Sequence, residues 1–247
     1  MSSKFGLNLT RNYSHNFSIP KRSKKKLNYL IIHYTGMRSE IDAIRKLCDS
    51  RSKVSSHYFI KNNGNILNLV PDLYEAWHAG ISSWKNLNSL NKYSIGIEIH
   101  NQGHDHGYKS FSSKQITSLV KLLNYLKKKY NIKNKNILGH SDIAPNRKKD
   151  PGEKFPWKML AQKKLCFWHN LSEKKIIKHR KSKIKTYEKK EFINNLYKIG
   201  YCRIRKLNLS KNNQYLIQAF QRRFRQDLVD GKIDKECLLI SKNLLKS

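Results

Sequence analysis

The chain has 247 residues, with 51 Lys and Arg against 17 Asp and Glu, so its formal net charge at pH 7 is +34. This length allows one full domain and a smaller one, and no apolar run approaches the roughly 20 residues of a membrane span. Such a charge favours polyanionic partners, namely nucleic acid, anionic lipid or an acidic cell-wall polymer, unless the lysines merely solvate the surface.

The first part of the chain, residues 1–26, is polar and basic and ends in a cationic run. We expect a loosely ordered lead-in that is partly wrapped on the following domain. The first seven residues lack an apolar stretch and a small-residue cleavage site, so we see no signal peptide. This favours a cytoplasmic protein, with the cell envelope or periplasm as the alternative.

Short apolar runs predict the strands of a sheet. We expect strands over residues 27–34, 55–60, 66–70, 93–101 and 137–138. The Asn-Gly pair within residues 62–65 predicts a hairpin turn, because Asn-Gly tolerates positive φ. Alternation in the 93–101 strand places three isoleucines on one face and Glu98 on the other.

Helices are predicted between these strands. Ser39 opens one that runs to Leu47, with Ile41, Ile44 and Leu47 on one face. Ser112 and Gln115 match a capping box at the start of a longer helix that ends at Tyr130. A further short helix begins near Pro156. The fold class expected from this order is α/β, with a central mixed sheet of five or six strands flanked by helices.

The last third of the chain has a different pattern. Lysine dominates residues 172–190, and three amphipathic helical segments follow, with a turn at 230–234. We therefore expect four parts: a basic lead-in (1–26), a catalytic domain (27–165), a basic linker (166–188) and a small helical bundle (189–247). The cysteines Cys48, Cys166, Cys202 and Cys237 form no CxxC pair, so free thiols are expected, with two disulfides as the alternative.

The loop at 139–152 combines a histidine, a proline-stiffened turn, a basic cluster and an aspartate. His140 leaves a short apolar strand, Asp150 precedes Pro-Gly, and His33 ends an earlier buried strand. Two imidazoles and a carboxylate that converge are the ligands of a catalytic zinc site, which keeps one position open for water. We therefore predict that these three residues bind one zinc ion.

Amide hydrolysis at such a site also needs a proton carrier and a group that stabilises negative charge. Glu98, on the polar side of an apolar strand, suits the first role. Lys148, two positions before Asp150, suits the second.

Each of these residues also has a purely structural interpretation. A histidine at a strand end often makes structural hydrogen bonds, and Glu98 can sit in a salt bridge within so basic a chain. His57, His78 and His100 are further candidates of the same type. His104 and His106 flank an aspartate in a glycine-bounded loop and are expected to be solvated.

Four segments carry a resemblance to a known family: IIHYT at 31–35, AWHAG at 76–80, SIGIE at 94–98, and GHSDIAPNRKKDPGEKFPW at 139–157. In this order they resemble the type 2 N-acetylmuramoyl-L-alanine amidases, a zinc family related to peptidoglycan recognition proteins, and within it the AmpD and AmiD branch. The resemblance implies His33, His140 and Asp150 as zinc ligands, Glu98 as catalytic acid/base and Lys148 as the transition-state stabiliser.

The same resemblance implies hydrolysis of the amide between N-acetylmuramic acid and L-alanine in peptidoglycan or muropeptides, including 1,6-anhydro forms. The segment 217–224 resembles a peptidoglycan-binding-like helical domain. Basic and aromatic residues are expected to contact the substrate, namely Trp77, His78, Trp84 and Arg147. Two departures from the family pattern, Asn146 in place of glycine and Glu153-Lys154 in place of a proline-containing stretch, bear on loop shape rather than on the ligands.

Two other functions remain as alternatives. A non-catalytic peptidoglycan-recognition module commonly lacks the third ligand, which is present here as Asp150. A nucleic-acid-binding basic protein, the less favoured alternative, predicts salt-dependent binding to unrelated DNA without a zinc requirement. The oligomeric state stays open.

Overall fold

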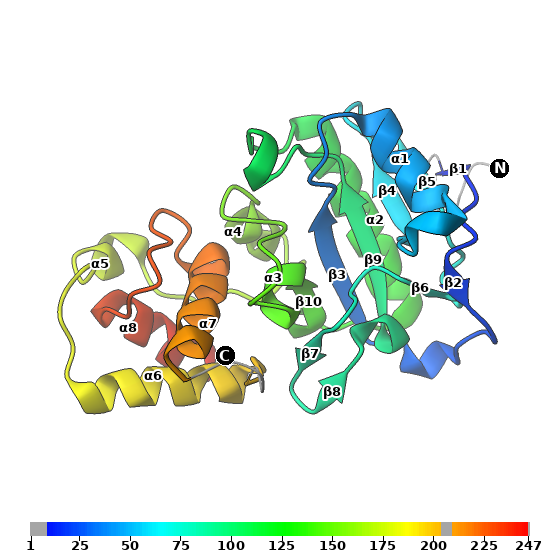
Figure 1. The fold of residues 1–247 in the computed structure, drawn as a ribbon. Coiled ribbons are helices and arrows are strands. Elements are labelled where there is room, and N and C mark those ends of the chain that lie inside the picture. Colours follow the sequence, from blue (N-terminus) through cyan, green and yellow to red (C-terminus); the bar gives the residue numbers. More distant parts are fainter. Residues whose placement is uncertain (1–8, 204–208, 247) are drawn as a thin grey trace.

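The computed structural model describes residues 9–203 and 209–246 and is built around one six-stranded sheet (Figure 1). The strand order is β1-β5-β4-β9-β3-β10, and neighbours are parallel except for the antiparallel β4–β5 hairpin. The strands are β1 (Leu9–Arg11), β3 (Tyr29–Tyr34), β4 (Tyr58–Ile60), β5 (Ile66–Asn68), β9 (Ser94–Ile99) and β10 (Ile137–Gly139). The predicted mixed sheet is therefore confirmed.

The central strands β3 and β9 lie between parallel neighbours and are buried, as their apolar runs predict. Their register pairs His33 with Glu98, so two residues 65 positions apart lie side by side at the carboxyl end of the sheet. The β4–β5 turn has Gly64 at φ +86°, the left-handed conformation expected for Asn-Gly.

Four helices and several short elements surround the sheet within residues 9–165. The helices are α1 (Glu40–Cys48), α2 (Ser113–Tyr130), α3 (His140–Ile143) and α4 (Trp157–Gln162). The 3₁₀ turns are η1 (Lys24–Lys26), η2 (Ser50–Ser52), η3 (Leu90–Tyr93), η4 (His104–His106) and η5 (Asn134–Asn136). Two small ribbons pair β2 (Phe17–Ser18) with β6 (Glu75–Ala76), and β7 (Ser83–Trp84) with β8 (Leu87–Asn88).

The helix caps follow the sequence closely, whereas one helix face does not. Ser112 and Gln115 form the predicted capping box of α2. Ser39 caps α1, but Ile41, expected on its buried face, is 61% exposed. The other two predicted residues are confirmed: Leu47 is buried and Ile44 packs beside it. Ala43 completes the contact with the sheet, which lies along a stripe rotated away from Ile41.

Residues before Leu27 add a strand to the sheet and make hydrogen bonds to the segments beside it. Strand β1 pairs with β5 at the sheet edge. Arg22 is 9% exposed and donates to the carbonyls of Asn91, Ser94 and Asp72. This arginine therefore ties the lead-in to the segment that enters β9.

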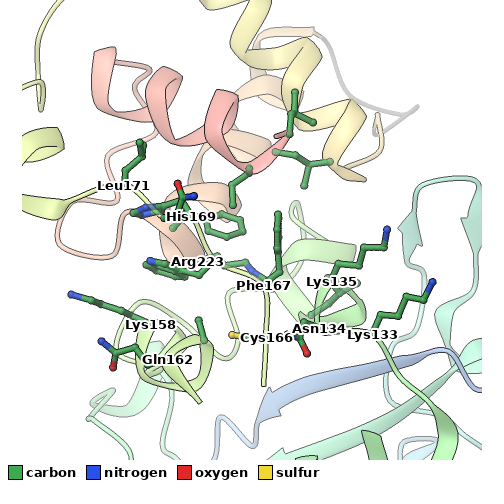
Figure 2. Close-up of a pocket in the computed structure, with 18 of the residues that line it drawn as sticks. Lys133, Asn134, Lys135, Lys158, Gln162, Cys166, Phe167, His169, Leu171 and Arg223 are labelled. Carbon is green, nitrogen blue, oxygen red and sulfur yellow. The ribbon is translucent and has the colours of Figure 1, made fainter. Parts of the chain in front are cut away.

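The C-terminal helices are α5 (Glu173–Ile177), α6 (Thr186–Ile199), α7 (Leu209–Phe224) and α8 (Lys235–Leu244). Their buried apolar side chains, including Phe192, Leu216 and Phe220, form one cluster with Ile31 and Leu138 of the sheet. The expected helical bundle is therefore present and docks on the domain, with α7 beside α3 (Figure 1). Where the two parts meet there is a cavity of about 1200 Å³, partly lined by Phe167, His169 and Arg223 (Figure 2).

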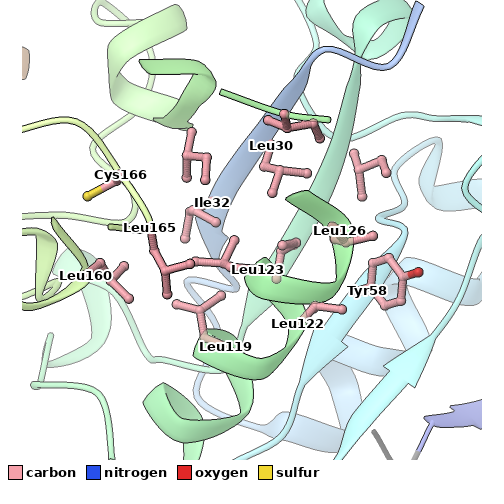
Figure 3. Close-up of a cluster of buried hydrophobic side chains, with 14 of the residues drawn as sticks. Leu30, Ile32, Tyr58, Leu119, Leu122, Leu123, Leu126, Leu160, Leu165 and Cys166 are labelled. Carbon is pink, nitrogen blue, oxygen red and sulfur yellow. The ribbon is translucent and has the colours of Figure 1, made fainter. Parts of the chain in front are cut away.

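The opposite face of the sheet carries the second apolar cluster (Figure 3). Leu119, Leu123 and Leu126 of α2 pack there against Leu30 and Ile32 of β3. All four cysteines are free thiols. Within the described residues, none of the helices combines the length and apolarity needed to cross a bilayer.

Candidate active site

Three buried side-chain atoms, each able to bind a metal ion, lie close together near the carboxyl ends of β3 and β10. His33 Nδ1 lies 2.9 Å from His140 Nδ1 and 3.0 Å from Asp150 Oδ2, and His140 Nδ1 lies 3.1 Å from Asp150 Oδ2. Ligand atoms of a tetrahedral zinc site with bonds of about 2.0–2.1 Å are roughly 3.3 Å apart. The triangle therefore has the size and the donor types of a zinc site.

The other nitrogen of His140 supports the same interpretation. His140 Nε2 lies 3.0 Å from the carbonyl oxygen of Ala79. A carbonyl accepts hydrogen bonds, so Nε2 carries the proton and the lone pair on Nδ1 points into the triangle. This is the backbone contact that commonly orients a metal-binding imidazole.

His33 is oriented by a second histidine. His33 Nε2 lies 3.0 Å from His78 Nδ1, and His78 Nε2 lies 3.2 Å from Ser94 Oγ, which donates to the carbonyl of Leu90 at 2.6 Å. With the Ser94 hydroxyl proton committed to Leu90, each imidazole donates from Nε2 and accepts at Nδ1. The relay therefore leaves the Nδ1 lone pair of His33 free for a ligand.

Gly96 makes room for this relay. A Cβ at this position of β9 would lie 2.3 Å from Cγ of His78. Only glycine therefore allows the His78 ring to lie this close to the strand behind His33.

The protonation states also suit metal binding. Burial and the charge of His140 lower the pKa of His33 to about 4, and burial likewise lowers the pKa of His78. Burial acts to raise the pKa of Asp150, but the charges and hydrogen bonds of His140 and His33 outweigh it and hold that pKa well below its usual range. At pH 7 His33 is therefore a neutral imidazole and Asp150 an ionised carboxylate, which are the ligating forms.

Glu98 lies beside His33 and differs from Asp150 in its protonation. Burial, followed by the charge of Asp150, raises its pKa to about 8, and Lys148 opposes the shift. Its Oε2 atom is buried and has no hydrogen-bond partner among the described residues. A carboxyl group with a pKa near neutrality and a free oxygen can both accept and donate a proton.

These groups share one cavity of about 360 Å³. Its lining includes the three donor residues, Glu98 and Lys148, together with three of the four residues expected to contact the substrate: Trp77, His78 and Arg147. Trp77 is half-buried and donates through Nε1 to Ser18, and Arg147 donates to the carbonyls of Ala79 and Ile81.

The structure places Trp84 elsewhere. It is 3% exposed and packs edge-on against Tyr201 at 5.0 Å between ring centroids, at the contact with the C-terminal helices. His104 lies between Tyr34 and Glu153, whereas His106 is exposed.

Sequence reasoning grouped His78 with the substrate groove and did not include Ser94, Gly96 or Ala79. The histidine within AWHAG and the glycine within SIGIE were visible signals. The contact of these residues with His33 was not visible, because it depends on the pairing of β3 with β9 and on the position of the loop that carries His78.

Comparison with known proteins agrees with this geometry. Residues 23–153 match the family model described as N-acetylmuramoyl-L-alanine amidase. The N-acetylmuramoyl-L-alanine amidase AmiD of Escherichia coli is 33% identical over 234 residues, which cover 90% of this chain and 83% of that protein. The 1,6-anhydro-N-acetylmuramyl-L-alanine amidase AmpD of Citrobacter freundii is 39% identical over 105 residues, which cover 42% and 54%.

Two solved structures resemble this one over most of its length. The complex of E. coli AmiD with the substrate anhydro-N-acetylmuramic acid-L-Ala-D-γ-Glu-L-Lys has a TM-score of 0.78 and covers 90% of this chain and 89% of that one. AmpDh3 of Pseudomonas aeruginosa in complex with anhydromuramic pentapeptide has the same TM-score at 28% identity, with coverages of 94% and 96%. The chain belongs to the N-acetylmuramoyl-L-alanine amidase family.

Proposed function

We propose that this protein hydrolyses the amide between N-acetylmuramic acid and L-alanine in peptidoglycan or muropeptides, including 1,6-anhydro forms. The observation that carries the proposal is the triangle of His33, His140 and Asp150 beside the unpaired carboxyl of Glu98 in one cavity. AmiD, which resembles this chain over most of its length, was solved with an anhydro-muropeptide substrate.

The proposed cofactor is one zinc ion per chain, held by His33, His140 and Asp150. When bound, zinc lowers the pKa of a water molecule to about 7 and polarises a carbonyl oxygen. The supporting features are the neutral imidazole of His33, the ionised carboxylate of Asp150 and the hydrogen bonds from Nε2 of both histidines.

Glu98 acts as the proton carrier in this proposal. In its ionised form, the Glu98 carboxylate accepts a proton from the attacking water through Oε2, and it then delivers this proton to the nitrogen of the departing L-alanine. A group with a pKa of about 8 holds and releases a proton near neutral pH, as general acid–base catalysis requires. Lys148, on the cavity wall, stabilises the negative charge that develops on the carbonyl oxygen.

Two further cavity residues, Trp77 and Arg147, bind the substrate. The Trp77 ring offers an apolar wall, and the Arg147 guanidinium offers a cation for a carboxylate of the stem peptide. His78 lies behind His33 and orients it. The roles of Trp77, Arg147 and His78 are inferred from where their side chains lie in the cavity.

We also propose a domain organisation for the chain. Residues 27–165 form the catalytic unit, which agrees with the family match over 23–153. Residues 1–26 form the lead-in, 166–188 the basic linker, and 189–247 a peptidoglycan-binding-like helical unit.

The test is mass analysis of products from whole sacculi and from soluble anhydro-muropeptides, each with and without a chelator. We expect release of the intact stem peptide with a free L-alanine amine, loss of that product after chelation, and its return with zinc. Asp150→Ala should bind no zinc and release no peptide.

A non-catalytic recognition module would bind muropeptides without releasing the stem peptide. That result with zinc-loaded protein would overturn the proposal.

A further inference from the structure

We propose that Arg223, on the C-terminal helix α7, is a positioning residue for His140. It holds the short helix α3, which begins at His140, and thereby makes the C-terminal helices part of the metal site. The inference rests on the proposed function, since it assigns a purpose to the orientation of a candidate zinc ligand.

Arg223 contacts the chain on both sides of His140. Its Nη2 donates to the carbonyl of Ile137 at 2.9 Å, three residues before the histidine. Its Nη1 donates to Asp142 Oδ2 at 2.5 Å, two residues after it. The segment that carries His140 is therefore fixed at both ends by one guanidinium group.

Asp142 is the hub of this contact. Oδ2 also accepts from the backbone N–H of Gly139 at 2.8 Å, and Oδ1 accepts from the Tyr201 hydroxyl at 2.8 Å. Tyr201 follows helix α6, so a second C-terminal residue reaches the same carboxylate. Three donors on two oxygens fix the orientation of the carboxylate, and with it the first turn of α3.

The cluster is shielded from water. Arg223, Asp142 and Tyr201 are 3%, 1% and 2% exposed, and the guanidinium lies 4.4 Å from the centroid of the Trp157 ring. Removing one partner of a buried ion pair leaves the other charge uncompensated and strongly destabilises the structure around it, so that the local backbone can rearrange. Here the backbone that would rearrange carries His140, whose Nδ1 must meet two other donor atoms.

The backbone around His140 is tightly packed. A Cβ at Gly139 would lie 2.7 Å from Cδ of Pro151 and 3.5 Å from Asp142 Oδ2. The backbone N–H of Ser141 donates to the carbonyl of Asp150 at 2.9 Å. A shift of α3 therefore disturbs this packing and, with it, the position of His140 beside Asp150.

Arg223 also borders a cavity. It lines the cavity between the two parts of the molecule, near Cys166 and His169 (Figure 2). Its Nε has no hydrogen-bond partner among the described residues, so the two Nη groups make the contacts to α3 and β10.

Arg225 supplies a matched control. It is 2% exposed and binds Asp230 and Asp234, and its Nε donates to the carbonyl of Leu228. It thus resembles Arg223 in burial and ion pairing, but these partners belong to the C-terminal segment.

The experiment compares Arg223→Met with Arg225→Met in the full chain. Zinc affinity of each metal-free protein is measured by competition with a chromogenic chelator, and the free energy of unfolding is measured separately. We expect both variants to lose stability, but Arg223→Met to lose about ten-fold or more in zinc affinity, as for supporting residues of metal ligands. Arg225→Met should retain the wild-type affinity.

Two further variants keep the inference testable if Arg223→Met does not fold. Tyr201→Phe removes one donor to Asp142, and Arg223→Lys keeps the charge but lacks the two-pronged geometry. Both should weaken zinc binding. With saturating zinc, kcat should fall in the Arg223 variants while KM stays unchanged.

Equal zinc affinities in the Arg223 and Arg225 variants would overturn the inference, as would wild-type affinity in both Arg223→Lys and Tyr201→Phe. A different set of results would contradict the proposed function and leave this inference intact. In that case the wild-type protein binds zinc, the variants differ as expected, and no muropeptide is cleaved.

Discussion

Replacing Glu98 by Gln tests the protonation state of the proposed proton carrier in two independent ways. The amide keeps the shape of the side chain but neither titrates nor transfers the proton. Turnover should fall by about 10²–10⁴-fold while zinc stays bound, because a positioned acid/base contributes about that much. In the metal-free protein the same substitution should also change how stability depends on pH.

The size of the second effect follows from the environment of Glu98. Its pKa rises from an ordinary value of 4.5 to about 8 because of burial and the charge of Asp150. Between these pH values the unfolded chain loses a proton that the folded protein keeps, so the free energy of unfolding falls as pH rises. The full difference corresponds to about 5 kcal/mol. Glu98 is only partly buried, so we expect about 2 kcal/mol.

The assay is urea denaturation of chelator-treated wild-type protein and Glu98→Gln at pH 5 and pH 8. The buried histidines titrate in both proteins, so they cancel in the comparison. Relative to wild type, Glu98→Gln should gain about 2 kcal/mol of stability between pH 5 and pH 8. A relative change below about 0.5 kcal/mol, near the error of the extrapolation, would refute the argument that Glu98 is protonated in the folded site.

The remaining predictions concern the surroundings of the site. Lys148→Met should lower kcat by about 10²–10³-fold without weakening zinc binding, which kinetics and chelator competition would separate. His78→Ala should weaken zinc binding by about 10–100-fold, whereas His106→Ala, in an exposed turn, should leave it unchanged. Arg22→Met should cost about 3 kcal/mol in urea denaturation because three carbonyls lose a charged donor, whereas the exposed Arg45→Met should leave the free energy of unfolding unchanged.

The elements of this fold were largely predictable because their signals are local. The apolar runs predicted β3 and β9, Asn-Gly predicted the β4–β5 turn, and Ser112 with Gln115 predicted the start of α2. The exposed face of α1 was not predictable in the same way. Which stripe of a short helix is buried depends on where the sheet contacts it, and Ile41 lies outside that contact.

Aromatic and histidine residues in loops show the same limit. The AWHAG segment and Trp84 both looked like walls of a groove. The structure places Trp77 on the cavity, His78 behind His33, and Trp84 against Tyr201 from the C-terminal part. Composition identifies such loops as important, but the side that each ring faces is decided by distant packing partners.

The sequence by itself determined the chemical types available: two histidines that leave buried strands, an aspartate in a stiff loop and a glutamate on the polar side of a strand. The tertiary structure decided that they meet, because parallel strand pairing places His33 beside Glu98 and brings His140 to the same edge. It also decided what holds them there. Arg223 reaches Asp142 across 81 positions of the chain, and no local pattern encodes a contact that depends on docking one part of the molecule on another.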